Sequence, residues 1–275
     1  MKILFYPDLT KDIFNKLKAW INQYTDATCS YAEEYPDIIV GFNNRVMWDE
    51  VTPFVKSKPV RAMYFLSQPR PYADAQWHDS MEETAELYSY GKCMAETQYK
   101  AFKFLPYPVD ITVIPEILLS DTIKAVRSIS GYRKDNFGLN WYKTYRAKRE
   151  CEELGIPVTT LYGLPHPRYF DELIKHNLYI GRFSLPGNIG RQELEAGASG
   201  LAVIGGFTEC MDMFKTMDND FPFIAVTKDE FKPYVSLLTI EEVKRLGRLN
   251  RDWMHEHYTP EKIAQYWVNK LKEVI

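Results

Sequence analysis

A glycine-rich loop that leads into a predicted helix is the feature of this sequence that most directly suggests chemistry. Gly187, Asn188 and Gly190 lie in the loop, and the helix begins directly after them. Glycines let a ligand approach the backbone closely, and the first amides of a helix have no partner within it, so such a turn favours an anion. Glu195 lies about one turn into the helix, where its carboxylate can accept hydroxyl groups of a ribose. Together, these residues suit a nucleotide sugar.

Cationic side chains lie near this loop and in an earlier one. Arg182 and Arg191 flank the glycines, and Ser184 offers a hydroxyl group to a phosphate. Arg133 and Lys134 follow a predicted strand. A cation beside a diphosphate stabilises the charge that develops on a leaving group as a glycosidic bond breaks, and it can take the place of Mg²⁺. The alternative for Arg133 and Lys134 is a basic turn that faces solvent.

Short apolar runs alternate with amphipathic segments, which predicts an α/β protein with parallel sheets. The predicted strands cover residues 2–6, 37–41, 60–66, 86–90, 123–129, 158–162, 178–181, 201–204 and 223–226. The predicted helices cover residues 12–24, 92–102, 139–154, 166–175 and 191–199, and a last helix follows residue 259.

Two prolines within residues 105–110 interrupt this alternation, because proline lacks an amide donor and resists helix and central strand. We place a domain boundary there. The predicted domains are 1–110 and 111–255, both Rossmann-like, followed by a C-terminal helix, 256–275, that packs on the first domain. Ligands of open α/β sheets bind beyond the carboxyl ends of the strands, so the expected site is the cleft between the domains.

The segment 195–204 resembles the C-terminal domain of GT-B fold glycosyltransferases. The similarity is greatest to the large retaining family whose signature has two glutamates separated by seven residues, followed by Ala-x-Ala-x-Gly-x-Pro-Val-Ile. Glu195 matches the second glutamate, whereas the first falls on Gly187 and the proline on Ala202. The resemblance implies that Glu195 holds the ribose of the donor.

Three further segments resemble this family. Residues 105–110 look like the linker before its second domain, and residues 250–267 look like the closing helix that crosses back to the first. Residues 130–138 look like the loop that carries Arg and Lys to the donor diphosphate. Arg133 fits this pattern, whereas Lys134 lies closer to the arginine than the family's lysine does.

The resemblance implies a GT-B architecture of two Rossmann-like domains that face each other across a cleft. The implied activity is that of a hexosyl- or pentosyltransferase, which moves a sugar from a nucleoside diphosphate sugar to a hydroxyl group. The nucleotide sugar is then the co-substrate, and we expect no metal and no further cofactor. A modified DNA base and a glycan are the candidate acceptors.

The first domain is expected to supply the acceptor site and any base. Asp8 follows the first predicted strand, where the resembling family brings a glycine-rich loop to the donor, and His78 lies beyond a middle strand. An inverting reaction needs a carboxylate or histidine that takes the acceptor proton, whereas a retaining one needs no strong base. The catalytic candidates are Asp8, His78 and Arg133.

Two other functions remain open. The chain has 275 residues and a formal charge of −3, from 34 Lys and Arg against 37 Asp and Glu, which excludes a uniformly basic coat. Residues 127–149 nevertheless contain seven basic residues and one acid, and Trp141, Tyr142 and Tyr145 interleave with them, so this face suits a nucleic-acid-binding protein. The second alternative is a nucleotide-sugar isomerase with the same two-domain shape.

The sequence predicts a cytoplasmic protein without a membrane span. It has no run of about 18 apolar residues, and its first residues are too short an apolar stretch for a signal peptide. Its four cysteines are scattered and read as reduced thiols. Its five histidines do not join them at zinc-ligand spacing, so no metal site is expected.

Overall fold

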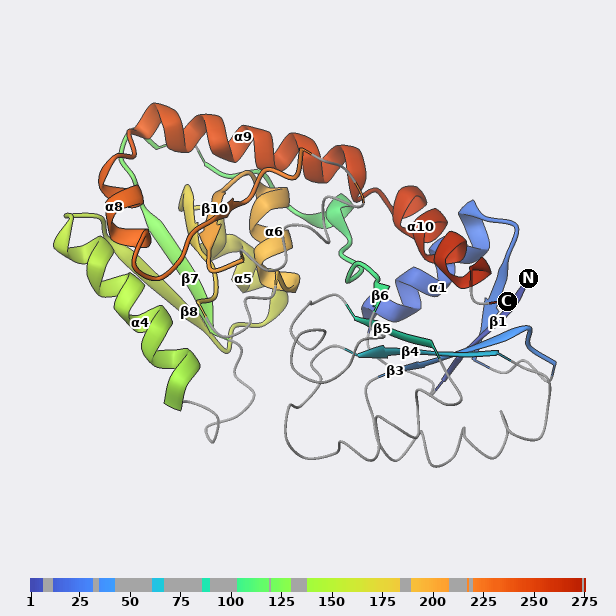
Figure 1. Ribbon diagram of the computed structural model, residues 1–275. Helices are drawn as coiled ribbons and strands as arrows, with labels where there is room; N and C mark the ends of the chain where they lie inside the picture. Colours follow the sequence, from blue (N-terminus) through green and yellow to red (C-terminus); the bar gives the residue numbers. More distant parts are fainter. Residues whose placement is uncertain are drawn as a thin grey trace. The chain divides into compact units, whose positions relative to one another are not determined.

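The computed structural model (Figure 1) divides into two compact units, Met1–Asp110 with Thr259–Ile275, and Ile111–Tyr258. The structure describes residues 1–6, 12–31, 35–42, 61–66, 86–89, 103–118, 120–129, 138–183, 189–207, 217, 220–273 and 275.

The first unit contains a sheet of six parallel strands in the order β2-β1-β3-β4-β5-β6. The strands are β1 (Lys2–Tyr6), β2 (Thr28–Ser30), β3 (Ile38–Phe42), β4 (Arg61–Leu66), β5 (Glu86–Ser89) and β6 (Lys103–Phe104). Helix α1 (Asp12–Tyr24) connects β1 to β2 and contacts α10 (Pro260–Lys272).

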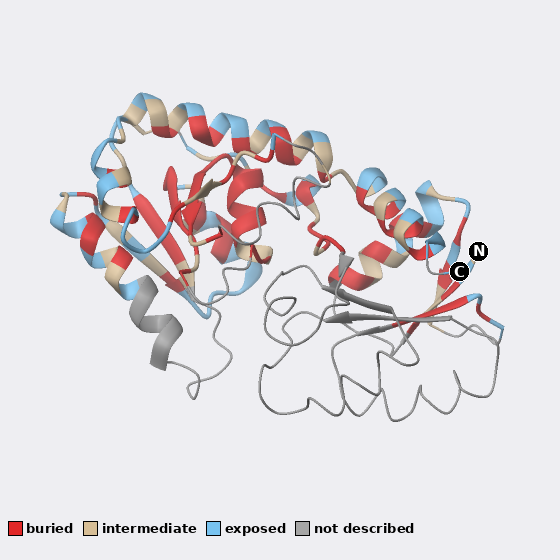
Figure 2. Cartoon of the chain, viewed as in Figure 1, coloured by how far each residue is buried: buried red, intermediate tan, exposed pale blue. Residues whose placement is uncertain are grey.

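Helix α10 is part of the first unit because its apolar stripe is buried there. Ile263, Trp267 and Leu271 recur at helical spacing and have no exposed surface. The indole nitrogen of Trp267 donates a hydrogen bond to the carbonyl of Pro106 at 3.0 Å, and its ring lies 6.5 Å from that of Phe5 on β1. Figure 2 shows this buried side of α10 in red.

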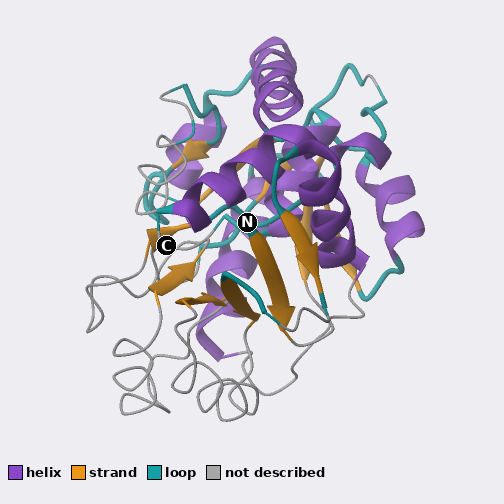
Figure 3. Ribbon diagram, turned by 90° about the vertical axis from the view of Figure 1, so that its right-hand side faces the viewer, coloured by secondary structure: helices purple, strands orange, loops and turns teal. Residues whose placement is uncertain are grey.

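The second unit contains five parallel strands in the order β11-β10-β9-β7-β8. The strands are β7 (Ala125–Ile129), β8 (Val158–Tyr162), β9 (Leu178–Ile180), β10 (Ala202–Gly205) and β11 (Ile224–Ala225). The helices are the 3₁₀ turn η1 (Ile111–Val113), α4 (Gly138–Glu153), α5 (His166–Leu173), α6 (Arg191–Ser199), α8 (Phe231–Ser236) and α9 (Ile240–His257). Figure 3 shows these helices and strands from another side.

Helices α4 and α5 cover opposite faces of the second sheet. Ala125 on β7 belongs to the same apolar cluster as Cys151 of α4. Ser128, three residues along the strand, instead contacts the hydroxyl of Tyr169 on α5. Since successive side chains of a strand alternate between faces, the two helices lie on different sides.

The strand order reverses direction between β7 and β9. The chain passes from β7 outward to the edge strand β8, then returns across β7 to β9 and continues to β10. Helix α5 therefore crosses over β7 and comes to lie beside α6. Open α/β sheets bind ligands at such a reversal, beyond the carboxyl ends of the strands, and this is the edge where α5 and α6 begin.

The predicted strands and helices are confirmed within the described residues, with ends that shift by up to two residues. The sequence did not predict the short strands β2 and β6, helix α8, or the part of α9 (Ile240–His257) before Asn250. The closing helix expected over 250–267 is in fact two helices, since α9 ends at His257 and α10 begins at Pro260. The break follows from Pro260, which lacks an amide donor, and from the Thr259 hydroxyl, which accepts the amide of Lys262 and starts α10. The predicted helix 92–102 lies outside the described residues.

Two cysteines, Cys29 and Cys151, are buried and free. Burial raises the pKa of both thiols, that of Cys151 to about 12, and both fit the expectation of reduced thiols. Within the part of the chain that the structure describes, no helix has the length and apolar character needed to cross a bilayer.

Candidate functional site

Glu195 lies on α6 with its side chain almost wholly buried. The helix begins after Gly190, which has extended backbone, and it ends at Gly200, whose φ of 97° is the left-handed conformation that glycine adopts easily. Only 3% of the surface of Glu195 is exposed to solvent. A carboxylate removed from water needs donors around it, so its partners indicate what this position does.

One oxygen of Glu195 has two partners. Its Oε1 accepts from Nε of Arg191 at 2.6 Å and lies 3.0 Å from Nε2 of His166. Arg191 is one turn earlier on α6, whereas His166 is the first residue of α5. Among the described residues no hydrogen bond reaches Oε2. The carboxylate is therefore anchored at one oxygen and has acceptor capacity left at the other.

A second buried carboxylate lies at the start of α6. Glu193 is 1% exposed, and its Oε2 accepts the backbone amide of Gly190 at 3.1 Å. Its Oε1 lies 3.5 Å from Nε of Arg182. Glu193 therefore caps the first turn of α6 and also pairs with Arg182, which lies two residues after β9.

Two buried tyrosines, Tyr169 and Tyr179, lie close enough to these carboxylates to feel their charge. Tyr169 follows His166 by one turn on α5, and its hydroxyl oxygen accepts from Ser128 at 3.4 Å. Burial, reinforced by the negative charge of Glu195, raises the pKa of Tyr169. Burial and the charge of Glu193 likewise raise the pKa of Tyr179 on β9. Both phenols are therefore neutral at physiological pH and add no negative charge beside Glu193 and Glu195.

Four of the predicted site residues can be placed. Glu195, Arg191 and Gly190 lie together at the start of α6, and Arg182 contacts Glu193 beside them. Arg182 and Arg191 are both paired with carboxylates of α6. Seven predicted residues lie outside the described part: Asp8, His78, Arg133, Lys134, Ser184, Gly187 and Asn188.

The sequence analysis missed two residues of this site, Glu193 and His166. Histidine after a strand and between two prolines gives no signal by itself. Its meeting with Glu195 depends on the strand order, which brings α5 beside α6. The first residue of each helix that follows a strand could have been taken as a candidate site residue, because the starts of these helices lie along one edge of a parallel sheet.

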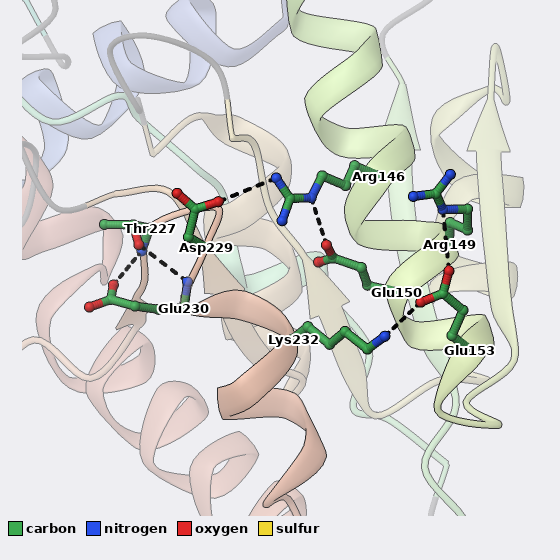
Figure 4. A network of polar contacts seen from close by, with 8 residues as sticks. All are labelled: Arg146, Arg149, Glu150, Glu153, Thr227, Asp229, Glu230 and Lys232. Carbon is green, nitrogen blue, oxygen red and sulfur yellow. Dashed lines mark hydrogen bonds and ion pairs between the residues drawn. The ribbon is translucent and has the colours of Figure 1, made fainter.

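Three of the four described basic side chains of segment 127–149 are paired with acids, and Figure 4 shows Arg146 and Arg149. Arg146 contacts Glu150 at 2.6 Å and Asp229 at 3.3 Å, and Arg149 lies 3.4 Å from Glu153. The remaining two have these surroundings: Lys148 pairs with Glu152, and Arg127 is 3% exposed beside Thr160. The acids follow the segment directly or come from the loop before α8, so this face carries less free positive charge than its sequence suggests.

Within the described ranges, no three histidine, cysteine, aspartate or glutamate side chains gather as metal ligands. Carboxylates of α4 and of the loop before α8 are occupied by ion pairs with Arg146, Arg149 and Lys232.

No protein-family model and no curated protein sequence matches the chain. Solved structures match it strongly. HepE from Anabaena, in complex with UDP and glucose, has a TM-score of 0.63 at 9% identity, and the match covers 99% of this chain and 100% of that one. The β-glucosyltransferase of T4 phage has a TM-score of 0.55 at 12% identity, with 100% and 99% covered. The predicted GT-B fold is therefore confirmed.

The same fold occurs in other structures that the chain resembles. A protein from Listeria monocytogenes, described as a candidate UDP-N-acetylglucosamine 2-epimerase, has a TM-score of 0.51 at 10% identity, with 98% and 95% covered. TarM has a TM-score of 0.56 at 10% identity, and the match covers 84% of this chain. The chain spans about half the length of TarM, at 54%.

Proposed function

We propose that this chain is a glycosyltransferase that moves a sugar from a nucleoside diphosphate sugar to a hydroxyl acceptor. The observation that carries the proposal is Glu195, a carboxylate that is 3% exposed and anchored at Oε1, with no partner for Oε2 among the described residues. It lies at the reversal of strand order in a GT-B fold, where open sheets bind ligands.

In this proposal Glu195 accepts hydroxyl groups of the donor ribose. The start of α6, from Gly190 and Arg191, lies one turn away and faces the diphosphate, because the positive end of the helix dipole favours negative charge. Gly190 suits this position, since an added Cβ would lie 3.2 Å from Glu193 Oε2 and 3.6 Å from an Arg182 nitrogen.

The remaining predicted residues have these proposed roles. Arg133, with Lys134, neutralises the charge on the departing diphosphate in place of a metal ion. Ser184, Gly187 and Asn188 belong to the loop around the donor phosphates. Asp8 and His78 serve the acceptor side, where an inverting reaction needs a base. A glycan and a modified DNA base are the proposed acceptors, and a cytoplasmic location remains a prediction.

The first experiment measures melting temperature with UDP, GDP and their sugars. A ligand at about 100 times its Kd stabilises the folded protein by about 2.7 kcal/mol, so at least one nucleotide is expected to raise the melting temperature clearly. Glu195→Gln keeps the size of the side chain but removes its charge, and it is expected to bind about tenfold more weakly, since hydrogen bonds to charged groups contribute about 1.5–3 kcal/mol.

Glu172→Gln is the matched control. Glu172 is also a glutamate of the second unit, but it is exposed on α5 and pairs with Lys175, so its loss is expected to leave nucleotide binding unchanged. A well-folded wild-type protein whose melting temperature responds to none of these ligands contradicts the proposal. Equal binding by wild type and Glu195→Gln contradicts the role of Glu195.

An isomerase of nucleotide sugars is the second candidate, because the Listeria monocytogenes protein described as a candidate epimerase also resembles the chain over 98% of its length. Incubation with a UDP-sugar alone separates the two functions. An isomerase converts the sugar without an acceptor, whereas a transferase leaves it attached or releases it slowly to water.

Nucleic-acid binding through segment 127–149 receives less support, because the ion pairs of Arg146, Lys148 and Arg149 neutralise much of its charge. Titration of DNA at several salt concentrations tests it. Several phosphate contacts give a steep decrease of affinity with salt, and we expect weak binding without such a slope.

A further inference from the structure

We propose that His166 is a positioning residue of the donor site, which holds Oε1 of Glu195 so that Oε2 faces the ribose hydroxyl groups. This inference rests on the proposed function, since Glu195 meets a ribose only if the chain binds a nucleoside diphosphate.

The imidazole of His166 is held firmly. Pro165 precedes it in extended backbone, with φ of −60°, and Pro167 follows within the first turn of α5, so the backbone on both sides has little freedom. The ring lies edge-on to Phe170, with centroids 4.6 Å apart and planes at 71°. Nε2 is therefore held on the side of the ring that faces Glu195, although the residue is 45% exposed.

Arg191 cannot fix Glu195 in the same way. It comes from the same helix, four residues earlier, so it moves together with Glu195 and fixes it to no other element. His166 belongs to a different helix and connects Glu195 to α5. A functional group is oriented best by partners whose own conformations are fixed, and the two flanking prolines and the ring contact with Phe170 fix His166 in this way.

Either hydrogen placement on the ring keeps the cluster together. Nε2 of His166 lies within hydrogen-bond distance of Arg191 as well as Glu195. A protonated Nε2 donates to Oε1 of Glu195, and an unprotonated Nε2 accepts from the Arg191 guanidinium. In both arrangements the imidazole remains beside Oε1 and leaves Oε2 for a ligand.

The test compares a nucleoside diphosphate with its 2′,3′-dideoxy analogue, which lacks the hydroxyl groups that Glu195 would bind. UDP or GDP is used, whichever stabilises the wild type more. Calorimetric Kd values are measured for wild type, His166→Ala, His166→Gln and the control Glu172→Ala. Wild type and the control are expected to prefer the ribonucleotide by about tenfold or more, as expected for a charge-assisted hydrogen bond.

His166→Ala is expected to lose most of that preference, through weaker binding of the ribonucleotide and unchanged binding of the analogue. His166→Gln is expected to restore part of it, because its amide can donate to Oε1. The comparison with the analogue separates positioning from general damage, which weakens both ligands equally. If His166→Ala does not fold, the inference is tested by whether His166→Gln has a smaller preference for the ribonucleotide than the wild type.

Three results overturn the inference. The first is an unchanged preference for the ribonucleotide in His166→Ala, and the second is an equal loss of affinity of His166→Ala for both ligands. The third applies if His166→Ala does not fold. It is a His166→Gln variant that keeps the full wild-type preference or loses affinity for both ligands equally. A wild-type protein that binds no nucleoside diphosphate overturns the proposed function as well, and this result is distinguishable because it appears before any substitution.

Discussion

At the scale of single residues, the second unit removes several polar side chains from water and satisfies them with specific partners. His176, next to the start of β9, is 7% exposed. Its Nδ1 lies 3.0 Å from the carbonyl of Glu172, and its Nε2 lies 2.8 Å from the hydroxyl of Thr159. The carbonyl can only accept, so Nδ1 carries the hydrogen and Nε2 accepts from Thr159. This arrangement suits a neutral imidazole.

Burial lowers the pKa of His176 below its ordinary value, which predicts a pH dependence of stability. As pH falls below about 6.5, His176 becomes protonated in the unfolded chain but stays neutral in the folded chain. The unfolded state then holds more protons, so the free energy of unfolding decreases as the pH falls, by at most ~1.4 kcal/mol per pH unit, until the folded pKa is reached.

Urea unfolding at several pH values between about 7 and 5 measures this effect. His176→Gln lacks the titrating group and is expected to have a smaller slope in this range. Thr159→Val removes one partner but keeps the histidine, and it is expected to retain a slope. Equal slopes in wild type and His176→Gln would show that His176 does not contribute.

At the scale of elements, helix α9 packs unusually closely on the turn between α6 and β10. The side-chain amide of Asn250 donates to the carbonyl of Leu201 at 2.8 Å, and Arg251 donates to that of Ala198 at 2.8 Å. A Cβ added at Gly247 would collide with the carbonyl oxygen of Gly200. Gly247 therefore sets the distance between α9 and the turn that ends α6.

Gly247→Ala is expected to destabilise the protein although alanine favours helix. At a helix position with free space, replacing glycine by alanine would stabilise the folded protein by about 0.5–1 kcal/mol. At Gly247 the added methyl group collides with a backbone atom, so we expect the folded protein to lose about 1–3 kcal/mol of stability. Chemical denaturation measures the difference. Arg248→Ala, at the exposed neighbour, is expected to change stability by less than about 0.5 kcal/mol. A Gly247→Ala protein as stable as wild type would contradict this packing.

Several helices and the longer strands could be predicted from the sequence, whereas some short strands and the contacts between elements could not. Helices such as 12–24 and 191–199 were predictable because their apolar residues recur at helical spacing and their ends have clear signals. Strand β2 has only three residues, too few for a pattern. Glu195 was predictable from its place after a glycine loop, but its partner His166 was not, because their contact depends on the order of strands in the sheet.

At the scale of the whole molecule, the chain forms two units that each have a sheet of their own, and its last helix returns to the first unit. Trp267 of α10 has no exposed surface and bonds to Pro106. The stability of the first unit therefore depends on residues more than a hundred positions away in sequence.

Trp267→Ala is expected to destabilise the first unit by about 3–5 kcal/mol, the usual cost of removing a buried aromatic side chain. Urea unfolding followed by circular dichroism measures the loss. Lys262→Ala, on the exposed side of α10, is the control and is expected to resemble wild type. Unchanged stability in Trp267→Ala would contradict the assignment of α10 to the core of the first unit.

The central claim is that a nucleoside diphosphate binds where α5 and α6 begin. Hydrogen exchange of the wild-type protein, measured with and without the UDP or GDP that stabilises it, tests this claim most directly. We predict slower exchange in peptides that cover residues 160–170 and 189–199 when the nucleotide is present, and unchanged exchange in α8. Slower exchange confined to other segments, with these two unaffected, would contradict the account.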